Sequence, residues 1–213
     1  TLTGLKIHDG QITGVKYQKQ TGETGELETR HLILAVGHSA RDTFSMLYDA
    51  GLVMEAKSFS VGARIEHPQS LIDKAQYGTA AGHPALGAAD YKLAVHLPDG
   101  GAAAGRGVYT FCMCPGGFVV AAASEEGRVV TNGMSCFARD GQNANAALLV
   151  GVSPEDYGSD HPLAGIEFQR RLEEAAFRAG GGGYRAPAQR VEDFLLKRAS
   201  TRLGEVTPTY RPG

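Results

Sequence analysis

The sequence predicts a mixed α/β fold of the α+β kind, in which a three-stranded meander and one buried strand precede a strand-rich region with flanking helices. Residues 2–36 alternate around two glycine-containing turns, the first of which is Asp9-Gly10, a strong hairpin signal. Residues 32–36 are apolar without a break, which is typical of a strand buried on both faces. Beyond residue 58 the chain is rich in further short strand-like runs.

The apolar run opens into Gly37-His38-Ser39 and an expected helix over residues 43–54. Gly37 has no Cβ, so it can adopt a positive φ or let another molecule approach its backbone. Ser39 or Asp42 could cap the helix through a side-chain oxygen. A buried strand that leads into a glycine turn and a helix is where α/β proteins hold anions and nucleotides, although an ordinary strand-to-helix connection is the alternative.

The other elements follow from apolar periodicity and turn residues. Residues 144–152 are apolar and could form a strand or a short helix. A soft boundary near residues 54–58 divides the chain into residues 1–55 and residues 56–213. Expected strands are residues 59–65, 90–97, 108–114, 118–123 and 128–133, and expected helices are residues 69–77, 161–180 and 190–199.

Composition and charge exclude several classes of protein. The 213 residues carry a formal net charge of -2 and so offer no basic surface for nucleic acid or lipid. No apolar run approaches the ~20 residues that a membrane helix needs, so neither nucleic acid nor a membrane is an expected partner. Three cysteines are too few for a disulfide framework and fit a reducing compartment, which favours a cytoplasmic location. The chain begins at Thr1 rather than Met, so we expect it to be a piece of a longer protein.

A second candidate site is the run Phe111-Cys112-Met113-Cys114-Pro115-Gly116-Gly117. In a strand, Cys112 and Cys114 would share one face, and small buried apolar side chains are the simplest interpretation. A metal would need two more ligands, which Cys136 and the scattered histidines do not offer, so no metal is expected. A redox dithiol would more naturally be C-x-x-C. The turn Pro115-Gly116-Gly117 could bring bare backbone against a flat ligand.

A third candidate site lies between residues 131 and 145. Its residues are turn formers, so a polar loop is one interpretation. They also offer many hydrogen-bond donors with little bulk, which would suit the edge of a heterocycle or a ribityl-like chain. The residues concerned are Asn132, Gly133, Met134, Asn143 and Asn145.

Arg64 and Glu66 lie two residues apart in an expected strand and would point to the same face. They could be a solvated pair, which we favour slightly, or Arg64 could reach an anionic group through its guanidinium fork. A lone histidine such as His38 is more often structural than catalytic. No catalytic residue is assigned, and the candidates are Cys112, Cys114, His38 and Arg64.

Together these stretches resemble the bacterial FAD-dependent dehydrogenases, a family of uncharacterised NAD(FAD)-utilising proteins distantly similar to flavoproteins with two dinucleotide-binding domains. The run F-C-M-C-P-G-G, followed by S-E-E-G and N-G-M-S, is far more specific than a single glycine motif. The resemblance covers most of the chain, in residues 32–42, 54–69, 76–78, 109–117, 124–135, 139–145 and 189–213.

The resemblance implies a flavin-dependent oxidoreductase that uses FAD, with NAD(P)H as a candidate electron donor and a small-molecule substrate that it does not identify. Residues 1–55 would be part of an FAD-binding domain, and residues 56–213 part of a substrate or cap domain. The chain would be a central fragment, because the family's N-terminal glycine-rich fingerprint and C-terminal closing segment are absent from the sequence. We therefore expect weak FAD binding, or none, by this chain alone.

The resemblance also implies positions for the candidate residues. Gly37, His38 and Ser39 would lie near FAD. The two later stretches would face the isoalloxazine or the substrate with Pro115, Gly116, Gly117, Asn132, Gly133 and Met134, and Asn143 and Asn145 would add donors. The alternative is a domain that binds a ligand or a partner without redox chemistry.

Overall fold

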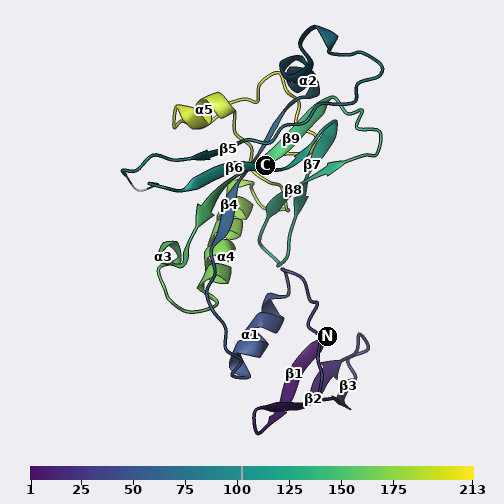
Figure 1. Cartoon of the computed structure of the whole chain (residues 1–213), viewed down its shortest axis with the longest axis vertical. Coiled ribbons are helices and arrows are strands. Elements are labelled where there is room, and N and C mark those ends of the chain that lie inside the picture. The colour runs from purple at the N-terminus through teal and green to yellow at the C-terminus, as the bar shows by residue number, and fades with distance from the viewer. Residues whose placement is uncertain (102) are drawn as a thin grey trace. The chain divides into compact units, whose positions relative to one another are not determined.

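The chain folds into two units that each combine helices with strands, which confirms the predicted α+β class. A computed structural model describes residues 1–101 and 103–213 (Figure 1). Unit 1 comprises residues 1–57 and 157–167, and unit 2 comprises residues 58–156 and 168–213. The sequence does not predict the return of the later segment to unit 1.

Unit 1 is built on an antiparallel meander with one helix. The strands are β1 (Leu2–His8), β2 (Gln11–Gln18) and β3 (Thr24–Glu28), in the order β1-β2-β3, and the helix is α1 (Arg41–Asp49). Asp9 and Gly10 have φ values of 49° and 74°, as a tight hairpin turn between β1 and β2 requires. Val15 of β2 and Leu47 of α1 are buried.

The apolar run of residues 32–36 is not a strand, and this prediction is wrong for the chain described here. Ile33 is 91% exposed and Val36 is 40% exposed. A strand needs a neighbour for its backbone hydrogen bonds, and an apolar run needs cover on both faces to be buried. The described residues of unit 1 supply neither to this run, so its composition alone does not make it a strand.

Helix α1 begins two residues earlier than predicted, and this changes its N-cap. Ala40, rather than Ser39 or Asp42, occupies the N-cap position, and its methyl side chain makes no capping hydrogen bond. Ser39 instead accepts a hydrogen bond from Arg41 N through its backbone oxygen, at 2.9 Å. The helix ends at Asp49, before Gly51, whose φ of 81° is typical of a helix stop.

Unit 2 contains a four-stranded antiparallel sheet in the order β4-β9-β6-β5. Its strands are β4 (Phe59–Pro68), β9 (Asn143–Val152), β6 (Gly107–Cys114) and β5 (Ala94–His96). The central strand β9 is formed by the residues whose pattern allowed either a strand or a helix. Its start is fully buried, with Ala144, Asn145 and Ala146 each 0% exposed. One partner strand on each side of β9, β4 and β6, therefore settles that this short apolar run forms a strand.

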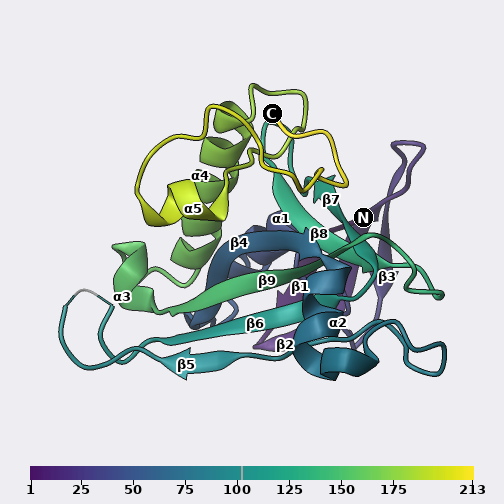
Figure 2. The same cartoon turned by 90° about the horizontal axis from the view of Figure 1, so that it is seen from above.

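A two-stranded ribbon of β7 (Gly117–Ala122) and β8 (Val130–Ser135) follows β6 in the chain, and α2 (Gln69–Tyr77) directly continues β4 (Figure 2). A short 3-10 turn, η1 (Gly78–Ala80), ends α2. Helix α4 (Ala164–Ala179) begins in unit 1 and continues into unit 2, where Phe168 contacts Phe59 of β4 edge to face. The remaining helices are α3 (Pro154–Tyr157) and α5 (Val191–Leu195).

Most predicted elements of unit 2 exist, with shifted ends. The helix predicted for residues 69–77 has those bounds. The strand predicted for residues 90–97 is shortened to β5, and the helix predicted for residues 190–199 is shortened to α5. In the described part of the chain, no helix is both long enough and apolar enough to span a membrane.

Candidate functional site

Four strands of unit 2 bring polar groups together where β6 ends and the turn to β7 begins. We call Arg64 of β4, Cys112 and Cys114 of β6, Gly133 of β8 and Asn145 of β9 the polar cluster. Arg64 Nη1 donates to Asn145 Oδ1 at 2.7 Å and to the Cys112 carbonyl oxygen at 3.3 Å. A Cβ at Gly133 would lie 2.8 Å from Cys114 Sγ and closer still to Arg64 Nη1 and Asn145 Oδ1. The absence of a side chain at Gly133 therefore lets the other members meet.

Asn145 is the centre of the polar cluster. It is 0% exposed, and its Nδ2 has no hydrogen-bond partner among the described residues. Arg64 Nε is buried and unpartnered in the same way. A buried N–H without an acceptor costs about 1–3 kcal/mol, so such atoms are rare unless something else accepts from them. The described residues therefore leave two donors of this cluster available to an acceptor that they do not supply, such as an ordered water or a ligand.

The end of β6 contains a bulge that the sequence did not predict. The pairing of β6 with β9 shifts between Phe111 and Cys114, and Cys112 has a φ of 45°. A left-handed conformation costs a non-glycine residue about 1–2 kcal/mol. The bulge breaks the alternation of side chains, and Cys112 is exposed whereas Cys114 is half-buried. The interpretation of both cysteines as small buried residues on one face is therefore wrong.

The glycines of the turn after β6 approach their own chain closely. A Cβ at Gly116, whose φ is 51°, would collide with the carbonyl group of Arg139. A Cβ at Gly117 would collide with the carbonyl oxygen of Met134 and lie 2.9 Å from Cys114 Cβ. Pro115, between Cys114 and Gly116, is buried as well. The bare faces of these glycines thus serve the packing of the turn, although both residues also line the groove described next.

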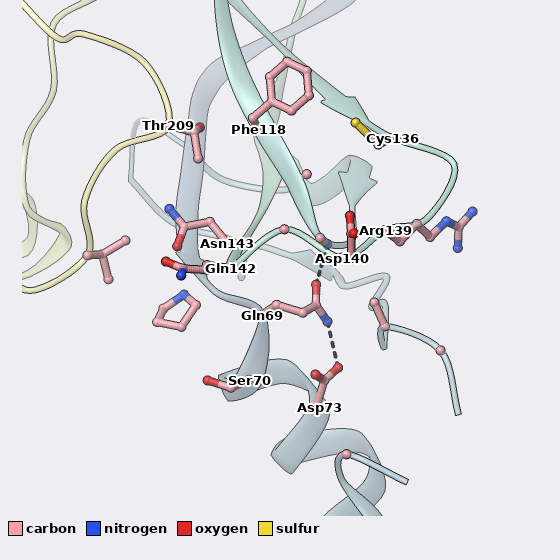
Figure 3. A pocket seen from close by; sticks show the side chains of 18 of the residues that line it. Gln69, Ser70, Asp73, Phe118, Cys136, Arg139, Asp140, Gln142, Asn143 and Thr209 are labelled. Carbon is pink, nitrogen blue, oxygen red and sulfur yellow. Dashed lines mark hydrogen bonds between the residues drawn. The ribbon is translucent and has the colours of Figure 1, made fainter. Parts of the chain in front are cut away.

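An open groove of about 1130 Å³ lies beside this turn (Figure 3). Its walls come from the start of α2, the loop before β9, the turn after β6 and residues 205–209. The polar side chains that line it include Gln69, Ser70, Asp73, Arg139, Asp140, Gln142, Asn143 and Thr209.

Gln69 fixes the floor of the groove. It is 6% exposed, accepts from Gly116 N at 2.7 Å and donates to Asp73 Oδ1 at 2.8 Å and to the Ala89 carbonyl at 2.9 Å. These bonds tie α2 to the turn after β6. Gln69 was not singled out from the sequence, because its bonds to Ala89 and Gly116 join residues 20 and 47 positions apart.

Glu66 fastens residues 205–209 to the sheet. Its Oε1 accepts from Asn143 Nδ2 at 3.0 Å, from Thr209 N at 3.1 Å and from Thr209 Oγ1 at 2.6 Å. Thr209 Oγ1 also accepts from Val119 N of β7 at 2.8 Å. Glu66 and Arg64 are both half-buried and hydrogen-bonded, so the interpretation of a solvated pair is wrong. Thr209 is a site residue that sequence reasoning missed.

His67 and Tyr91 form a second polar pair in unit 2. His67 Nε2 lies 2.8 Å from the Tyr91 hydroxyl, and His67 Nδ1 is buried without a partner among the described residues. Burial lowers the pKa of His67 below its usual value, against the opposing effects of backbone hydrogen bonding at Pro68 and His67 and of the negative charge of Glu66. Burial likewise raises the pKa of Tyr91, against the positive charge of Arg64. The neutral form of each is therefore favoured.

The predicted site residues are divided between unit 2 and unit 1. Unit 2 gathers Arg64, Cys112, Cys114, Gly133 and Asn145 in the polar cluster and Gly116, Gly117 and Asn143 along the groove. Asn132 and Met134 of β8 are exposed, and Asn132 Oδ1 accepts from Gly133 N at 2.8 Å. Gly37, His38 and Ser39 belong to unit 1, where all three are exposed and Gly37 has a φ of 73°.

Comparison with known proteins assigns the family. Residues 58–213, nearly three quarters of the chain, match the model of a family described as FAD-dependent protein, C-terminal domain-like. The chain therefore belongs to this family. It is 54% identical over 208 residues to an uncharacterized protein of Clostridium beijerinckii, covering 93% of this chain and 38% of that protein. The chain thus spans well under half the length of this relative.

The relation to FAD-dependent proteins that the motifs indicated is confirmed at the level of the family. A dehydrogenase activity and the use of NAD(P)H stay predictions.

Proposed function

We propose that this chain is part of a longer flavin-dependent oxidoreductase, here called the full-length protein, and that the polar cluster contacts its flavin. The observation that carries the proposal is the pair of buried, unpartnered donors, Asn145 Nδ2 and Arg64 Nε. Membership of a family of FAD-dependent proteins supports it, because a flavin ring has several carbonyl oxygens and ring nitrogens that accept hydrogen bonds.

The residues of the polar cluster fit a group of this kind. Asn145 is held by Arg64 through its oxygen, which leaves its NH₂ group as the donor. The hydrogen bonds of Arg64 go to neutral oxygens rather than to a carboxylate, so its positive charge is not cancelled by them. In a half-buried setting, such a charge favours a ligand that carries or develops negative charge.

FAD, when bound, would supply the hydride or electron transfer. The chain's own residues would orient it, with Asn145 and Arg64 as donors. Glu66 and Gln69 would act indirectly, as positioning residues. Glu66 holds residues 205–209 in place, and Gln69 holds the turn after β6.

Asn145→Asp in the full-length protein tests the proposal. Aspartate has the shape of asparagine and still accepts from Arg64, so the fold is expected to persist, but it has no N–H to donate. We expect flavin affinity to fall about tenfold, since removing one partner of a buried hydrogen bond costs about 1–3 kcal/mol. Flavin retained per protein and the dissociation constant from flavin fluorescence measure the effect, with the urea midpoint as a check on folding.

Gln11→Glu is the control, because it also replaces an amide by a carboxylate, at an exposed position of β2 that belongs to no candidate site. It should bind flavin like the unchanged protein. Equal affinity in Asn145→Asp and Gln11→Glu would contradict a role for the polar cluster. A full-length protein that binds no flavin would refute the proposed function, and bound flavin that no reductant bleaches would favour the alternative of a binding domain.

A further inference from the structure

Two thiols lie two residues apart on the bulge that ends β6. Cys112 is exposed, and its backbone has a φ of 45°. Cys114 is half-buried, and its thiol donates to the Cys112 carbonyl oxygen at 3.2 Å. The sulfur of Cys114 is therefore folded back over residue 112, rather than standing away from it as in a regular strand.

The bulge matters because a regular strand disfavours a bond between such cysteines. At about 3.3 Å per residue, two positions in a flat strand lie about 6.6 Å apart, close to the upper limit of Cα separations in disulfides. At the bulge, Cys114 Sγ lies 3.2 Å from the Cys112 carbonyl oxygen, a contact that a regular strand does not make. The exposed side chain of Cys112 is free to rotate towards Cys114, whose sulfur already lies against residue 112.

From this geometry we propose that Cys112 and Cys114 form a reversible dithiol–disulfide couple whose substrate class is a low-molecular-mass disulfide. The thiolate of Cys112 attacks one sulfur of the small disulfide, which releases one small thiol and leaves a mixed disulfide. The sulfur of Cys114 then attacks Cys112, forms the intrachain bond and releases the second thiol. The small disulfide gains two electrons, the two cysteines lose two, and their protons leave with the released thiols.

The roles of the two cysteines follow from their exposure. Cys112 is open to an incoming molecule, whereas Cys114 lies in the polar cluster beside Arg64 and Gly133 and acts as the resolving thiol. A transient couple of this kind also fits a reducing compartment, where lasting structural disulfides are rare. The inference deepens the proposed function, because it places redox chemistry in the same cluster, but formation of the disulfide does not depend on flavin.

Peptide mapping of the full-length protein tests the couple directly. The native protein is equilibrated with mixtures of oxidised and reduced glutathione, quenched, alkylated and digested with trypsin. Residues 107–128 form one tryptic peptide with Cys112 and Cys114, and residues 129–139 form another with Cys136. We expect the first peptide to lose both alkylation sites together and to be lighter by two hydrogens than the dithiol form, while Cys136 stays alkylated.

Single substitutions separate the two roles. Cys114→Ser should trap glutathione on Cys112, because no resolving thiol remains. Cys112→Ser should leave Cys114 alkylated, and Cys136→Ser should leave the couple unchanged. Glutathione on Cys136 as readily as on Cys112, a bond between Cys112 and Cys136, or two free thiols under fully oxidising mixtures would each overturn the inference.

Flavin content is measured on the same samples, which separates this inference from the proposed function. Disulfide formation in a protein without flavin would support the couple while the flavin proposal fails. Free thiols in a flavin-loaded protein would do the opposite.

Discussion

Gly37 of unit 1 and the glycines after β6 in unit 2 lie in opposite surroundings. In unit 2, the bare faces of Gly116, Gly117 and Gly133 are filled by neighbouring backbone and side chains of the same unit. In unit 1, Gly37 has nothing within 4 Å of the place where a Cβ would be, and Ile33 nearby is 91% exposed. Both stretches look alike as sequences, with an apolar run ahead of glycine.

The difference shows which of the two stretches is held in place by contacts within its own unit. The turn after β6 closes on its own unit, so the polar cluster is held by contacts that this chain supplies. The run before Gly37 has no such contacts among the described residues. Glycine in the first case is required by packing, and in the second by the backbone φ of 73° alone.

Replacing each glycine by alanine should separate these cases and give the largest effect. Gly116→Ala puts a Cβ into the Arg139 carbonyl group at a φ of 51°, so we expect a loss of about 3 kcal/mol in unfolding free energy. Gly37→Ala adds no collision and should cost about 1 kcal/mol for its backbone conformation. Urea unfolding measures both, and equal losses would break the comparison.

Releasing residues 205–209 should have a smaller effect. Glu66→Ala removes the acceptor for Thr209 and Asn143, and we expect the unfolding free energy to fall by about 1–2 kcal/mol and tryptic cleavage after Arg202 to become faster. Glu205→Ala, in the same segment and exposed, is the control and should cleave at the original rate. Unchanged cleavage in Glu66→Ala would show that this wall of the groove is held by other contacts.

His67 gives unit 2 a dependence on pH. Because burial lowers its folded pKa below the unfolded value of about 6.5, the unfolded chain takes up a proton first as pH falls. The unfolding free energy should therefore decrease from about pH 6.5 down to the folded pKa. The slope is at most about 1.4 kcal/mol per pH unit, and less because the ring is only partly buried.

Two variants test the cause of this slope by urea unfolding between about pH 7.5 and 5. His67→Gln should flatten it. Tyr91→Phe leaves the ring buried and should keep most of it. A slope that survives His67→Gln would assign the pH dependence to another group.

The smallest effect is expected in unit 1. Ile33→Lys changes a side chain that is 91% exposed and should alter the stability of this chain by less than about 0.5 kcal/mol. Leu47→Lys, at a position 5% exposed in the same unit, should cost several times more. A large loss in Ile33→Lys, measured by urea unfolding, would show that the run is covered after all.

Elements that depend on residues close together in the chain were predicted well from the sequence. Contacts between residues far apart in the chain were predicted poorly. The helix at residues 69–77 and the turn at Asp9-Gly10 follow from local pattern, and both are confirmed. The prediction of a buried strand at residues 32–36 was wrong, because an apolar pattern indicates burial but does not identify the residues that would pack against it.

The candidate site was predicted in part for the same reason. Its residue types were visible as a dense set of donors and glycines, so Arg64, Gly133 and Asn145 were singled out. Their mutual contacts were not visible, because they join four strands. The prediction that Cys112 and Cys114 share one face of a regular strand was wrong because of the bulge at Cys112. No local sequence pattern indicates that a cysteine will adopt a positive φ. Thr209 and Gln69 were missed because the bonds that place them at the site, to Glu66 and to Gly116, join residues far apart in the chain.

The bond between Glu66 and Thr209 has a consequence for how the protein is made. The two residues are 143 positions apart, and Asn143 and Val119 also precede Thr209. During translation, β4, β7 and β9 emerge from the ribosome before the stretch that completes the groove. The nascent chain therefore passes through an interval in which the polar cluster can assemble while one wall is still unmade. A ligand that depends on this wall can be captured only after residues 205–209 have been synthesised.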